Sequence, residues 1–443
     1  MNQRKAEEGR QFYEKVLELM EEHHRFIASA IPLIASENVP SPAVREALTC
    51  DFGNRYAEGW PGERVYAGCK YIDQVELLAI ELAKRVYNAE FADVRPISGV
   101  VANLAAYTVF ASPRDVMMAC SIPHGGHISH GKSKIGGTAG AVRGLEVVTY
   151  PFNIDDYEID IDATKKLVQD LARQGKPPKL FMLGASVFLF PHPVKEICEI
   201  AREVDGYVVY DAAHVAGLIA GGKFQDPLRE GADAVTMSTH KTLAGPQHGM
   251  ILSWNKYAEA IKRANFPGLL SNHHLHAVAG IAIALAEALA FYGEYAEQII
   301  RNAKTLAQSL YERGFKVLYE RRGFTESHTI LVDISEFGDG SAIEKRLEEC
   351  GIIVNRNLLP YDLKLGRNYM RPGGIRLGVQ EITRLGMKES EMKYIAELFK
   401  KALMDRLPAE KLRAEIAEFR AEYQKVHYCF SSLTDAYAYI RIR

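Results

Sequence analysis

Cysteine is scarce in this chain of 443 residues, which contains six, and no two of them form a C-x-x-C pair or a spacing typical of zinc sites. A low number of cysteines in a chain of this length is typical of proteins from a reducing compartment. We therefore expect a cytoplasmic protein with reduced, mostly buried thiols. A strong net charge is also missing: the formal value is −2. The sequence therefore gives no electrostatic reason to expect binding to nucleic acid or to an anionic membrane.

Long hydrophobic runs, internal repeats and low-complexity tracts are absent as well. Residues 1–26 mix Lys, Arg and Glu with apolar residues and lack the apolar core of a signal peptide. The most apolar stretch, residues 278–291, has only 14 residues and contains Glu287, so it is too short for a bilayer and predicts a core helix. What remains is the composition of a soluble globular protein, 47% apolar and 25% charged, long enough for two or three domains.

Strands and helices alternate between about residues 115 and 290. Short apolar runs predict strands near 116–118, 147–150, 180–183, 207–210, 232–237 and 250–252, with helices at about 162–173, 194–204 and 225–230. This alternation predicts an α/β fold with a parallel sheet. Further helices are predicted over about 4–30, from 41, over 73–89, from 104 and over 278–314.

From residue 315 onward the pattern changes to α+β. It predicts strands near 316–318, 329–333, 352–354 and 374–378, and helices near 341–350, 388–404 and 408–424. We therefore expect an N-terminal helical arm (1–50), a large cofactor-binding α/β domain (51–290) and a small C-terminal α+β domain (291–443).

Two of the predicted strands end on residues that could share one cofactor. Asp211 closes the run 207–210, and Lys241 follows the run 232–237 within Ser-Thr-His-Lys-Thr. A lysine amine can form a Schiff base with pyridoxal phosphate (PLP), and an aspartate can keep the pyridinium nitrogen of PLP protonated. For this pair in isolation, a strand-end Asp in a turn and a Lys in solvent would be the favoured interpretation.

Two other segments could complete a ligand site. Ser98 and Gly99 begin a predicted helix, where free N–H groups favour a phosphate, although many helices begin this way. The loop 53–71 contains four glycines, three tyrosines and a tryptophan, and Glu58 lies among these aromatic residues, where its pKa could be raised. The alternative for this loop is a packed segment without chemistry.

The segment 124–130 places three histidines within seven residues, which could suggest a metal site. The glycines between them suit close backbone approach and ring stacking better, and neither Cys nor a carboxylate lies nearby in the sequence. We therefore predict that the protein binds no metal.

These segments resemble serine hydroxymethyltransferases (glycine hydroxymethyltransferases), which are PLP enzymes of the aspartate aminotransferase fold type I. The resemblance extends from about residue 31 to the final helices and follows the family's order. The segments that carry it are 33–38 (LIASEN), 55–62 (RYAEGWPG), 98–99 with 102–103, 124–131 (HGGHISHG), 211–217 (DAAHVAG), 238–243 (STHKTL) and 374–378 (GIRLG). Segments 266–274 (FPGLLSNHH) and 427–430 (HYCF) are most similar to the archaeal, methanogen-like branch.

The resemblance implies the reversible interconversion of serine and glycine, with transfer of a one-carbon unit to a tetrahydropterin, in a homodimer with shared active sites. It assigns catalytic roles to Lys241, Glu58, His127, Asp211 and His214. It assigns Ser98 and Gly99 to the phosphate of PLP, His127 to the ring face, Asp211 to the ring nitrogen, His214 and Ser186 to the phenolate, and Lys241 to the covalent bond with PLP. His240, the neighbour of Lys241, is also expected to contact the cofactor.

The substrate side is assigned in the same way. Arg376, assisted by Ser36, would bind the amino-acid carboxylate, Glu58 would act as acid and base, and Asn357 would meet the pterin. Tyr56 and Tyr66 would reach the active site of a partner subunit. We expect His124, His130, His273 and His274 to be structural, and Arg384 to be a surface or salt-bridge residue.

Several positions depart from the family pattern. Val65 precedes Tyr66 where members that use folate carry two tyrosines, Val100 replaces a serine, and 269–272 (LLSN) replaces a glycine-rich turn. Ala244 and Gln247 replace arginines. These changes leave the PLP residues intact but leave the carrier open between tetrahydrofolate and tetrahydromethanopterin.

Two other functions remain as alternatives from the sequence. One is a pterin-independent aldolase or transaldolase acting on threonine-like β-hydroxy amino acids. The other is a catalytically silent homologue that binds RNA or a partner, against which the near-neutral charge and the presence of Lys241, Asp211 and Arg376 argue. The sequence distinguishes neither the preferred β-hydroxy amino acid nor a dimer from a tetramer.

Overall fold

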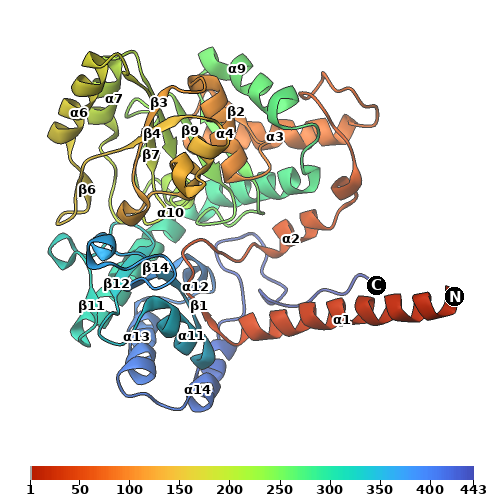
Figure 1. The fold of residues 1–443 in the computed structure, drawn as a ribbon. Helices are drawn as coiled ribbons and strands as arrows, with labels where there is room; N and C mark the ends of the chain where they lie inside the picture. The colour runs from red at the N-terminus through yellow and green to blue at the C-terminus, as the bar shows by residue number, and fades with distance from the viewer. Residues whose placement is uncertain (1) are drawn as a thin grey trace.

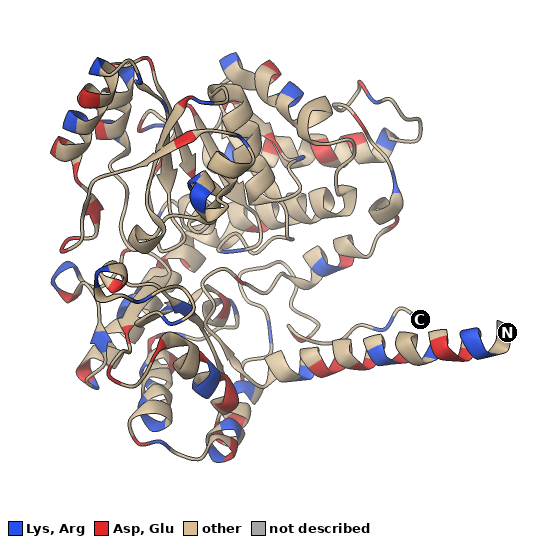
Figure 2. Cartoon of the chain, in the orientation of Figure 1, with Lys and Arg blue, Asp and Glu red and all other residues tan. Residues whose placement is uncertain are grey.

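The structure is a computed structural model that describes residues 2–443. It contains a larger part built on one β-sheet and a smaller part built on a second sheet, with helix α1 (Asn2–Ala28) extending away from both (Figure 1). Along the ribbon of Figure 2, positions occupied by basic and by acidic residues are interspersed over the helices rather than gathered by sign.

The large sheet has seven strands in the order β2-β10-β9-β8-β7-β3-β4. Their bounds are β2 (Phe91–Asp93), β3 (Val116–Ala119), β4 (Glu146–Thr149), β7 (Pro178–Gly184), β8 (Tyr207–Asp211), β9 (Ala234–Ser238) and β10 (Gly249–Ser253). Six of these strands run in one direction, and β10 runs antiparallel to both β9 and β2. The prediction of a parallel sheet is therefore wrong at β10, because the short segment between β9 and β10 cannot hold the helical crossover that a parallel connection needs.

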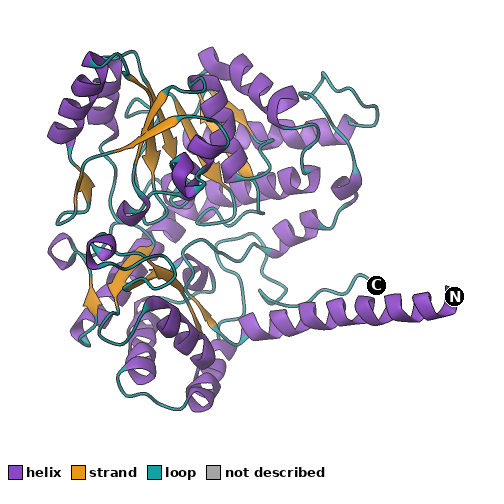
Figure 3. Ribbon diagram, in the orientation of Figure 1, coloured by secondary structure: helices purple, strands orange, loops and turns teal. Residues whose placement is uncertain are grey.

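Helices cover both faces of the large sheet (Figure 3), which is why its strands are almost continuously apolar. They are α3 (Lys70–Tyr87), α4 (Gly99–Phe110), α5 (Thr138–Ala141), α6 (Ile161–Arg173), α7 (Val194–Arg202), α8 (Ala216–Ala220) and α9 (Ala258–Arg263). The predicted helix over 225–230 is wrong: this segment is a turn, in which Glu230 accepts hydrogen bonds from Gln225 and from the N–H of Asp226. Neither α8 nor the three-residue strand β2 was predicted, because both are too short to show a period.

The small sheet is antiparallel, in the order β11-β12-β15-β14. Its strands are β11 (Lys316–Val317), β12 (Thr329–Asp333), β14 (Asn355–Asn357) and β15 (Gly374–Gly378), and its helices are α11 (Gly340–Cys350), α12 (Gln380–Arg384), α13 (Glu389–Leu403) and α14 (Ala409–Ala421). Two short pairs complete the strands, β1 (Ile31–Pro32) with β13 (Ile352–Ile353) and β5 (Phe152–Asn153) with β6 (Glu158–Ile159). The first pair joins the N-terminal segment to the strand that follows α11. Helix α2 (Pro42–Leu48) follows β1 in the chain.

Helix α10 (Leu275–Glu312) is long and apolar enough to cross a membrane, and no other helix among residues 2–443 meets that test. Its apolar window is 56% buried, and it packs against α2, α3 and α13, so it is a core helix, as predicted. The expected domain boundary near residue 290 falls within this continuous helix. The division into 1–50, 51–290 and 291–443 stays a prediction.

Helix α1 leaves most of its length uncovered. The side chains of Phe12, Tyr13 and Val16 are 69%, 56% and 56% exposed. The C-terminal segment lies beside the end of this helix that is nearer the body (Figure 1), where His24 contacts the carbonyl of Tyr437 at 2.7 Å. An apolar stripe of this kind on an otherwise solvated helix is typical of a surface that another chain covers.

Arg384 is fully buried, so the interpretation of this residue as a surface residue is wrong and the salt-bridge interpretation is confirmed. Its Nη2 donates to Glu287 Oε2 at 2.9 Å, and its other nitrogens donate to the carbonyls of Val39 and Tyr428. The pair joins α12 to α10 in the interior.

Replacing Glu287 with leucine is expected to destabilise the protein by about 3–5 kcal/mol, because it leaves the buried charge of Arg384 without its partner. Urea unfolding followed by circular dichroism measures the effect. Glu294→Leu, at an exposed position of the same helix, is the matched control. Equal midpoints for the two variants would contradict the importance of the pair.

Candidate active site

The carboxyl ends of β7, β8 and β9 meet at a cavity of about 230 Å³. All eight residues that the sequence assigned to the cofactor line it: Ser98, Gly99, His127, Ser186, Asp211, His214, His240 and Lys241. Ligands in α/β folds bind where strands end in this way. The sequence had placed these residues in five separate segments, and the fold brings them to one point.

Lys241 follows β9 and is 8% exposed. Its backbone carbonyl accepts a hydrogen bond from Asn38 Nδ2 at 2.8 Å, so the loop 33–38 helps to hold the segment that carries the amine. Burial, together with the charge of Arg376 and against the attraction of Asp211, lowers the pKa of Lys241 to about 8. The amine is therefore a far better nucleophile at neutral pH than an exposed lysine.

Asp211 accepts three hydrogen bonds. They come from the N–H of Ala213 at 2.9 Å, from Asn103 Nδ2 at 2.9 Å and from His130 Nε2 at 3.0 Å. Burial by itself raises the pKa of Asp211, but His130, His127 and Asn103 together hold it below its usual range. The cavity therefore contains a permanent carboxylate.

Asn103 and Thr236 were not among the predicted site residues, and His130 was expected to be structural. Thr236 Oγ1 donates to Asn103 Oδ1 at 2.6 Å, which orients the amide so that its NH₂ group faces Asp211. The available signal for Asn103 was its place in α4, a helix of mostly apolar residues where a buried amide needs a partner. Both Asn103 and His130 act on the cavity through Asp211.

His127 lines the cavity from the segment of short turns after β3. Its Nδ1 accepts from the N–H of Ser129 at 3.1 Å and lies 2.6 Å from the hydroxyl of the same residue. Burial, then the charge of His130, lowers the pKa of His127 to about 4. The ring is therefore uncharged at neutral pH.

The ligand atoms of His127, His130 and Asp211 lie within 4.8 Å of one another, close enough to consider a metal ion. The hydrogen bond between His130 and Asp211 explains their approach without an ion. The prediction of no metal therefore stays a prediction.

One end of the cavity suits a phosphate. Ser98 caps α4 by accepting from the N–H of Val101 at 3.2 Å, and a Cβ at Gly99 would lie 2.3 Å from Ser238 Oγ, so a larger residue would displace that hydroxyl. His240 Nδ1 is buried and has no hydrogen-bond partner among residues 2–443. A helix N-terminus beside an unpartnered imidazole nitrogen can hold an anion. With the amine of Lys241 and the carboxylate of Asp211, this set of groups fits PLP.

Arg376 extends from β15 of the small sheet and is 8% exposed. Its Nη1 donates to the carbonyl of Ser186 at 2.6 Å, and its Nε donates to Asn355 Oδ1 at 3.2 Å. Burial lowers the pKa of Arg376 to about 10, so the guanidinium stays charged at neutral pH. Its Nη2 makes no hydrogen bond within residues 2–443, which leaves N–H groups for a carboxylate.

Ser36 and Asn357 do not line the cavity. Ser36 is half-buried in the loop 33–38, two residues before Asn38, which contacts Lys241. Asn357 lies on β14 opposite Gly374, in the pair of strands that carries Arg376. His214 lines the cavity and contacts His328, a buried residue that the sequence analysis did not single out.

The three remaining predicted residues, Tyr56, Glu58 and Tyr66, do not reach the cavity of their own chain. The rings of Tyr56 and Tyr66 are 5.2 Å apart, and their side chains are 51% and 44% exposed. Glu58 accepts a hydrogen bond from the hydroxyl of Ser271. The fold therefore pairs Tyr56 with Tyr66, and none of the three side chains lines the cavity that contains Lys241.

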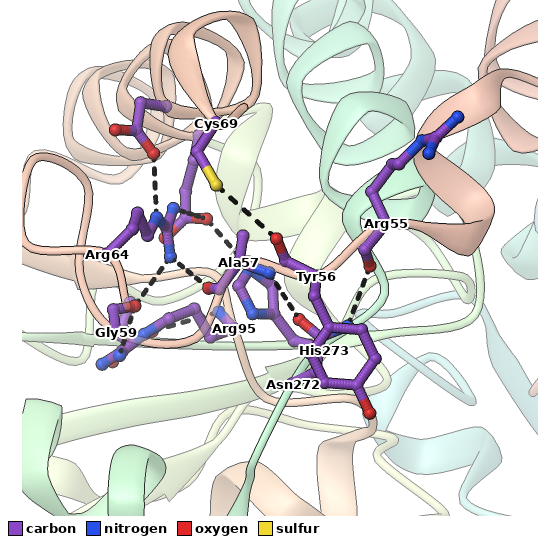
Figure 4. Close-up of polar contacts among 12 residues, drawn as sticks. Arg55, Tyr56, Ala57, Gly59, Arg64, Cys69, Arg95, Asn272 and His273 are labelled. Carbon is purple, nitrogen blue, oxygen red and sulfur yellow. Dashed lines mark hydrogen bonds and ion pairs between the residues drawn. The ribbon is translucent and has the colours of Figure 1, made fainter. Parts of the chain in front are cut away.

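The backbone around Tyr56 is held rigidly (Figure 4). Arg64 is almost fully buried and donates to the carbonyls of Ala57 and Gly59, each at 2.7 Å, while it pairs with Asp73 at 2.8 Å and Glu76 at 2.7 Å. In the same way, Asn272 accepts from the N–H of Ala57 and donates to the carbonyl of Arg55, each at 3.0 Å, and Cys69 donates to the carbonyl of Tyr56. The exposure of the Tyr56 ring is therefore a feature of a fixed loop.

Comparison with known proteins gives one consistent result. The family model described as serine hydroxymethyltransferase matches residues 10–399. A serine hydroxymethyltransferase of Nitrosopumilus maritimus (strain SCM1) is 57% identical over 436 residues, which cover 98% of this chain and 99% of the relative. The serine hydroxymethyltransferase of Korarchaeum cryptofilum (strain OPF8) is 56% identical over 425 residues, covering 94% and 97%.

A similar enzyme from a methanogen, the serine hydroxymethyltransferase of Methanothermobacter thermautotrophicus (strain Delta H), is 51% identical over 432 residues, covering 98% and 99%. The resemblance to archaeal enzymes, the PLP fold type and the enzyme class are thereby confirmed. The chain belongs to the serine hydroxymethyltransferase family, whose activity is the interconversion of serine and glycine with a pterin as the one-carbon carrier.

Proposed function

We propose that the cavity between β8 and β9 binds PLP and that Lys241 holds it covalently. The observation that carries this proposal is the juxtaposition of a buried amine and a buried carboxylate, delivered by adjacent strands to the N-terminus of α4. When bound, PLP supplies an electron sink for the negative charge left on the amino acid after its bond to the hydroxymethyl carbon breaks.

The residues of the chain have separate tasks toward that group. Asp211 keeps a proton on the ring nitrogen, and His127 packs against the ring. Ser98, Gly99 and His240 hold the phosphate at the N-terminus of α4. His214 and Ser186 lie near the phenolate oxygen, where a hydrogen-bond donor stabilises the charge.

The amino acid is bound from the small sheet. Arg376 offers its unpaired N–H groups to the substrate carboxylate, and Ser36 assists from the loop 33–38. The contacts of the guanidinium with Ser186 and Asn355 fix its plane before substrate arrives, so little side-chain entropy is lost on binding.

The active enzyme is a homodimer with shared sites, in which Tyr56, Glu58 and Tyr66 complete the cavity of the partner. Two observations support this: the three side chains lie on a rigid loop but do not reach the cavity of their own chain, and α1 exposes an apolar stripe. In this arrangement Glu58 acts as acid and base near the substrate hydroxyl. We place the enzyme in the cytoplasm, where the exposed thiol of Cys50 stays reduced.

Mixing two inactive variants, Lys241→Ala and Glu58→Gln, is expected to restore about a quarter of the wild-type activity. Random re-association gives hybrids in half of the dimers, and each hybrid has one site with both native residues. Serine cleavage is measured after co-refolding at equal concentrations. A mixture of Lys241→Ala with Asp211→Asn, both from the same side of the site, is the control and should stay inactive. If the first mixture also stays inactive, Lys241 and Glu58 act in the same chain or no dimer forms.

The carrier is a tetrahydropterin, which Asn357 contacts, and the departures in the sequence favour tetrahydromethanopterin. Val65 is 70% exposed beside Tyr66, where a second tyrosine would offer a stacking surface. One aromatic contact contributes about 0.5–1.5 kcal/mol.

We expect the kcat/KM with tetrahydrofolate to be about 2- to 12-fold below that with tetrahydromethanopterin, the factor that corresponds to one lost stacking contact. Steady-state turnover of serine with each carrier gives the two kcat/KM values. Val65→Tyr should raise the value with tetrahydrofolate toward the value with tetrahydromethanopterin. Equal values would mean that position 65 does not select the carrier. Threonine cleavage at the rate of serine cleavage, unaffected by either pterin, would instead indicate a pterin-independent aldolase.

A further inference from the structure

His328 is fully buried at the junction of three parts of the chain. It directly precedes β12 of the small sheet, its ring stacks on His214 in the loop after β8, and it contacts Ala35 of the N-terminal segment. The two imidazole centroids are 5.5 Å apart with an angle of 22° between the planes.

The Nε2 atom of His328 makes the contacts that determine where the protons of the two imidazoles lie. Its Nε2 lies 3.2 Å from the carbonyl oxygen of Ala35, 3.3 Å from Nδ1 of His214 and 3.2 Å from the hydroxyl of Thr329, which can accept as well as donate. A carbonyl oxygen can only accept, so Nε2 of His328 must carry the proton to make this contact favourable. The same N–H then faces Nδ1 of His214, which must accept and therefore carries no proton.

The opposite assignment is unfavourable. If Nδ1 of His214 carried the proton and donated to His328, the lone pair of Nε2 would face the carbonyl oxygen of Ala35 at 3.2 Å. Two acceptors at that distance in a buried site repel each other and leave the carbonyl without its donor. A doubly protonated His328 is also excluded at neutral pH, since burial lowers the pKa of His328 to about 3.

The carbonyl that sets this order is itself fixed. A Cβ on Gly378 would lie 2.3 Å from the Cα of Ala35, so the loop is pressed against the end of β15. Gln380 Nε2 donates to the carbonyls of Ile34 at 2.8 Å and Glu37 at 2.6 Å on either side of Ala35. The backbone that orients His328 thus belongs to the same strand and loop as Arg376 and Ser36.

We propose that His328 is a positioning residue that keeps the proton of His214 on Nε2, where it faces the cavity as a hydrogen-bond donor. His214 lines the cavity, and with Nδ1 turned to His328 its Nε2 is the ring nitrogen on the other side. That nitrogen makes no hydrogen bond to any residue between 2 and 443, so its N–H is available to an acceptor on a bound group. The chemical class of that acceptor is an anionic oxygen. Its identification with the phenolate of PLP rests on the proposed function, whereas the proton position is a property of the protein without PLP.

The contact between His328 and His214 also connects the small sheet to the loop after β8 of the large sheet. The carbonyl of His328 accepts from the N–H of Val379, directly after β15, while His214 follows β8. The orientation of His214 therefore depends on the correct position of the loop 33–38 and of β15, which carry Ser36 and Arg376. His328 connects these substrate-binding segments to the cofactor-binding residue His214.

The test is a long-range ¹H–¹⁵N correlation spectrum of the full-length protein, labelled with [¹⁵N]histidine and freed of PLP, at neutral pH. Signals of His214 are assigned by their loss in His214→Gln. In the wild type, Nε2 of His214 should be protonated, and Nδ1 should be unprotonated with the shift of a nitrogen that accepts a hydrogen bond. A protonated Nδ1 in the wild type overturns the proposal even if no variant folds.

Two variants separate positioning from packing. His328→Gln places an amide NH₂ group near the position of Nε2 and should preserve the Nδ1 shift of His214, whereas His328→Leu fills the space without a donor and should move it to the value of a free lone pair. His427→Leu, at an exposed histidine, is the matched control.

In the PLP-loaded enzyme, kcat should fall about 2- to 12-fold for His328→Leu and stay within about twofold for His328→Gln, the effect of one hydrogen bond. An unchanged Nδ1 shift in His328→Leu also overturns the proposal. If the Nδ1 shift of His214 changes in His328→Leu but kcat does not, His328 sets the proton position of His214 and that position has no effect on catalysis.

Discussion

Replacing Lys241 with alanine is expected to lower serine turnover by roughly three orders of magnitude or more and to abolish covalent attachment of PLP. Among residues 2–443, Lys241 is the only lysine that lines the cavity, and its lowered pKa, about 8, makes its amine the nucleophile there. Alanine removes the covalent anchor and leaves only the non-covalent contacts at Asp211, His127 and the N-terminus of α4. Because these contacts persist, the variant should still bind PLP reversibly.

Two measurements check this expectation. Mass spectrometry after borohydride reduction shows whether PLP is attached and at which lysine, and turnover of serine with a reduced pterin gives kcat. Lys256→Ala, at an exposed lysine beyond β10, is the control and should retain both properties. Covalent attachment and turnover that persist in Lys241→Ala would place the anchor at another residue and contradict the proposed site.

Segments with a clear period or motif were predictable from the sequence. The strands that end at Asp211 and near Lys241 are short apolar runs bounded by glycine, and the structure places them as the adjacent strands β8 and β9. The direction of β10 was not predictable in the same way, because direction depends on the length of the preceding connection and on the partner strand. The residues of the cofactor site were reached through motifs, and the fold then brought them to one cavity.

Residues that act through another residue carry no sequence pattern of this kind. Asn103 lies 108 positions from Asp211, and His328 lies 114 positions from His214. Each is defined by a contact that exists only once the chain is folded. Asn103 looks locally like an ordinary polar residue among apolar ones, and His328 looks like one polar residue among others. Burial and hydrogen-bond partners are therefore the quantities that reveal them.

Replacing Asp211 with asparagine is expected to lower kcat by about 150- to 5,000-fold while the protein remains folded. A neutral amide cannot keep the ring nitrogen of PLP protonated, and loss of one partner from a buried charge pair costs about 3–5 kcal/mol. The site itself opposes the substitution: Asn103, His130 and the N–H of Ala213 all donate to this side chain, so the NH₂ group of asparagine would face at least one donor.

The measurement for Asp211→Asn is kcat and the PLP dissociation constant, with Asp162→Asn at an exposed position of α6 as control. Asp211→Asn should lose far more in kcat than in serine KM, since Arg376 and not Asp211 meets the substrate carboxylate. Asn103→Leu should reproduce part of the loss, because it removes one of the three donors that hold the carboxylate in place and leaves the charge itself. If Asp211→Asn retained a kcat within tenfold of the wild type, Asp211 would be a structural residue and the ring nitrogen of PLP would have to lie elsewhere in the cavity.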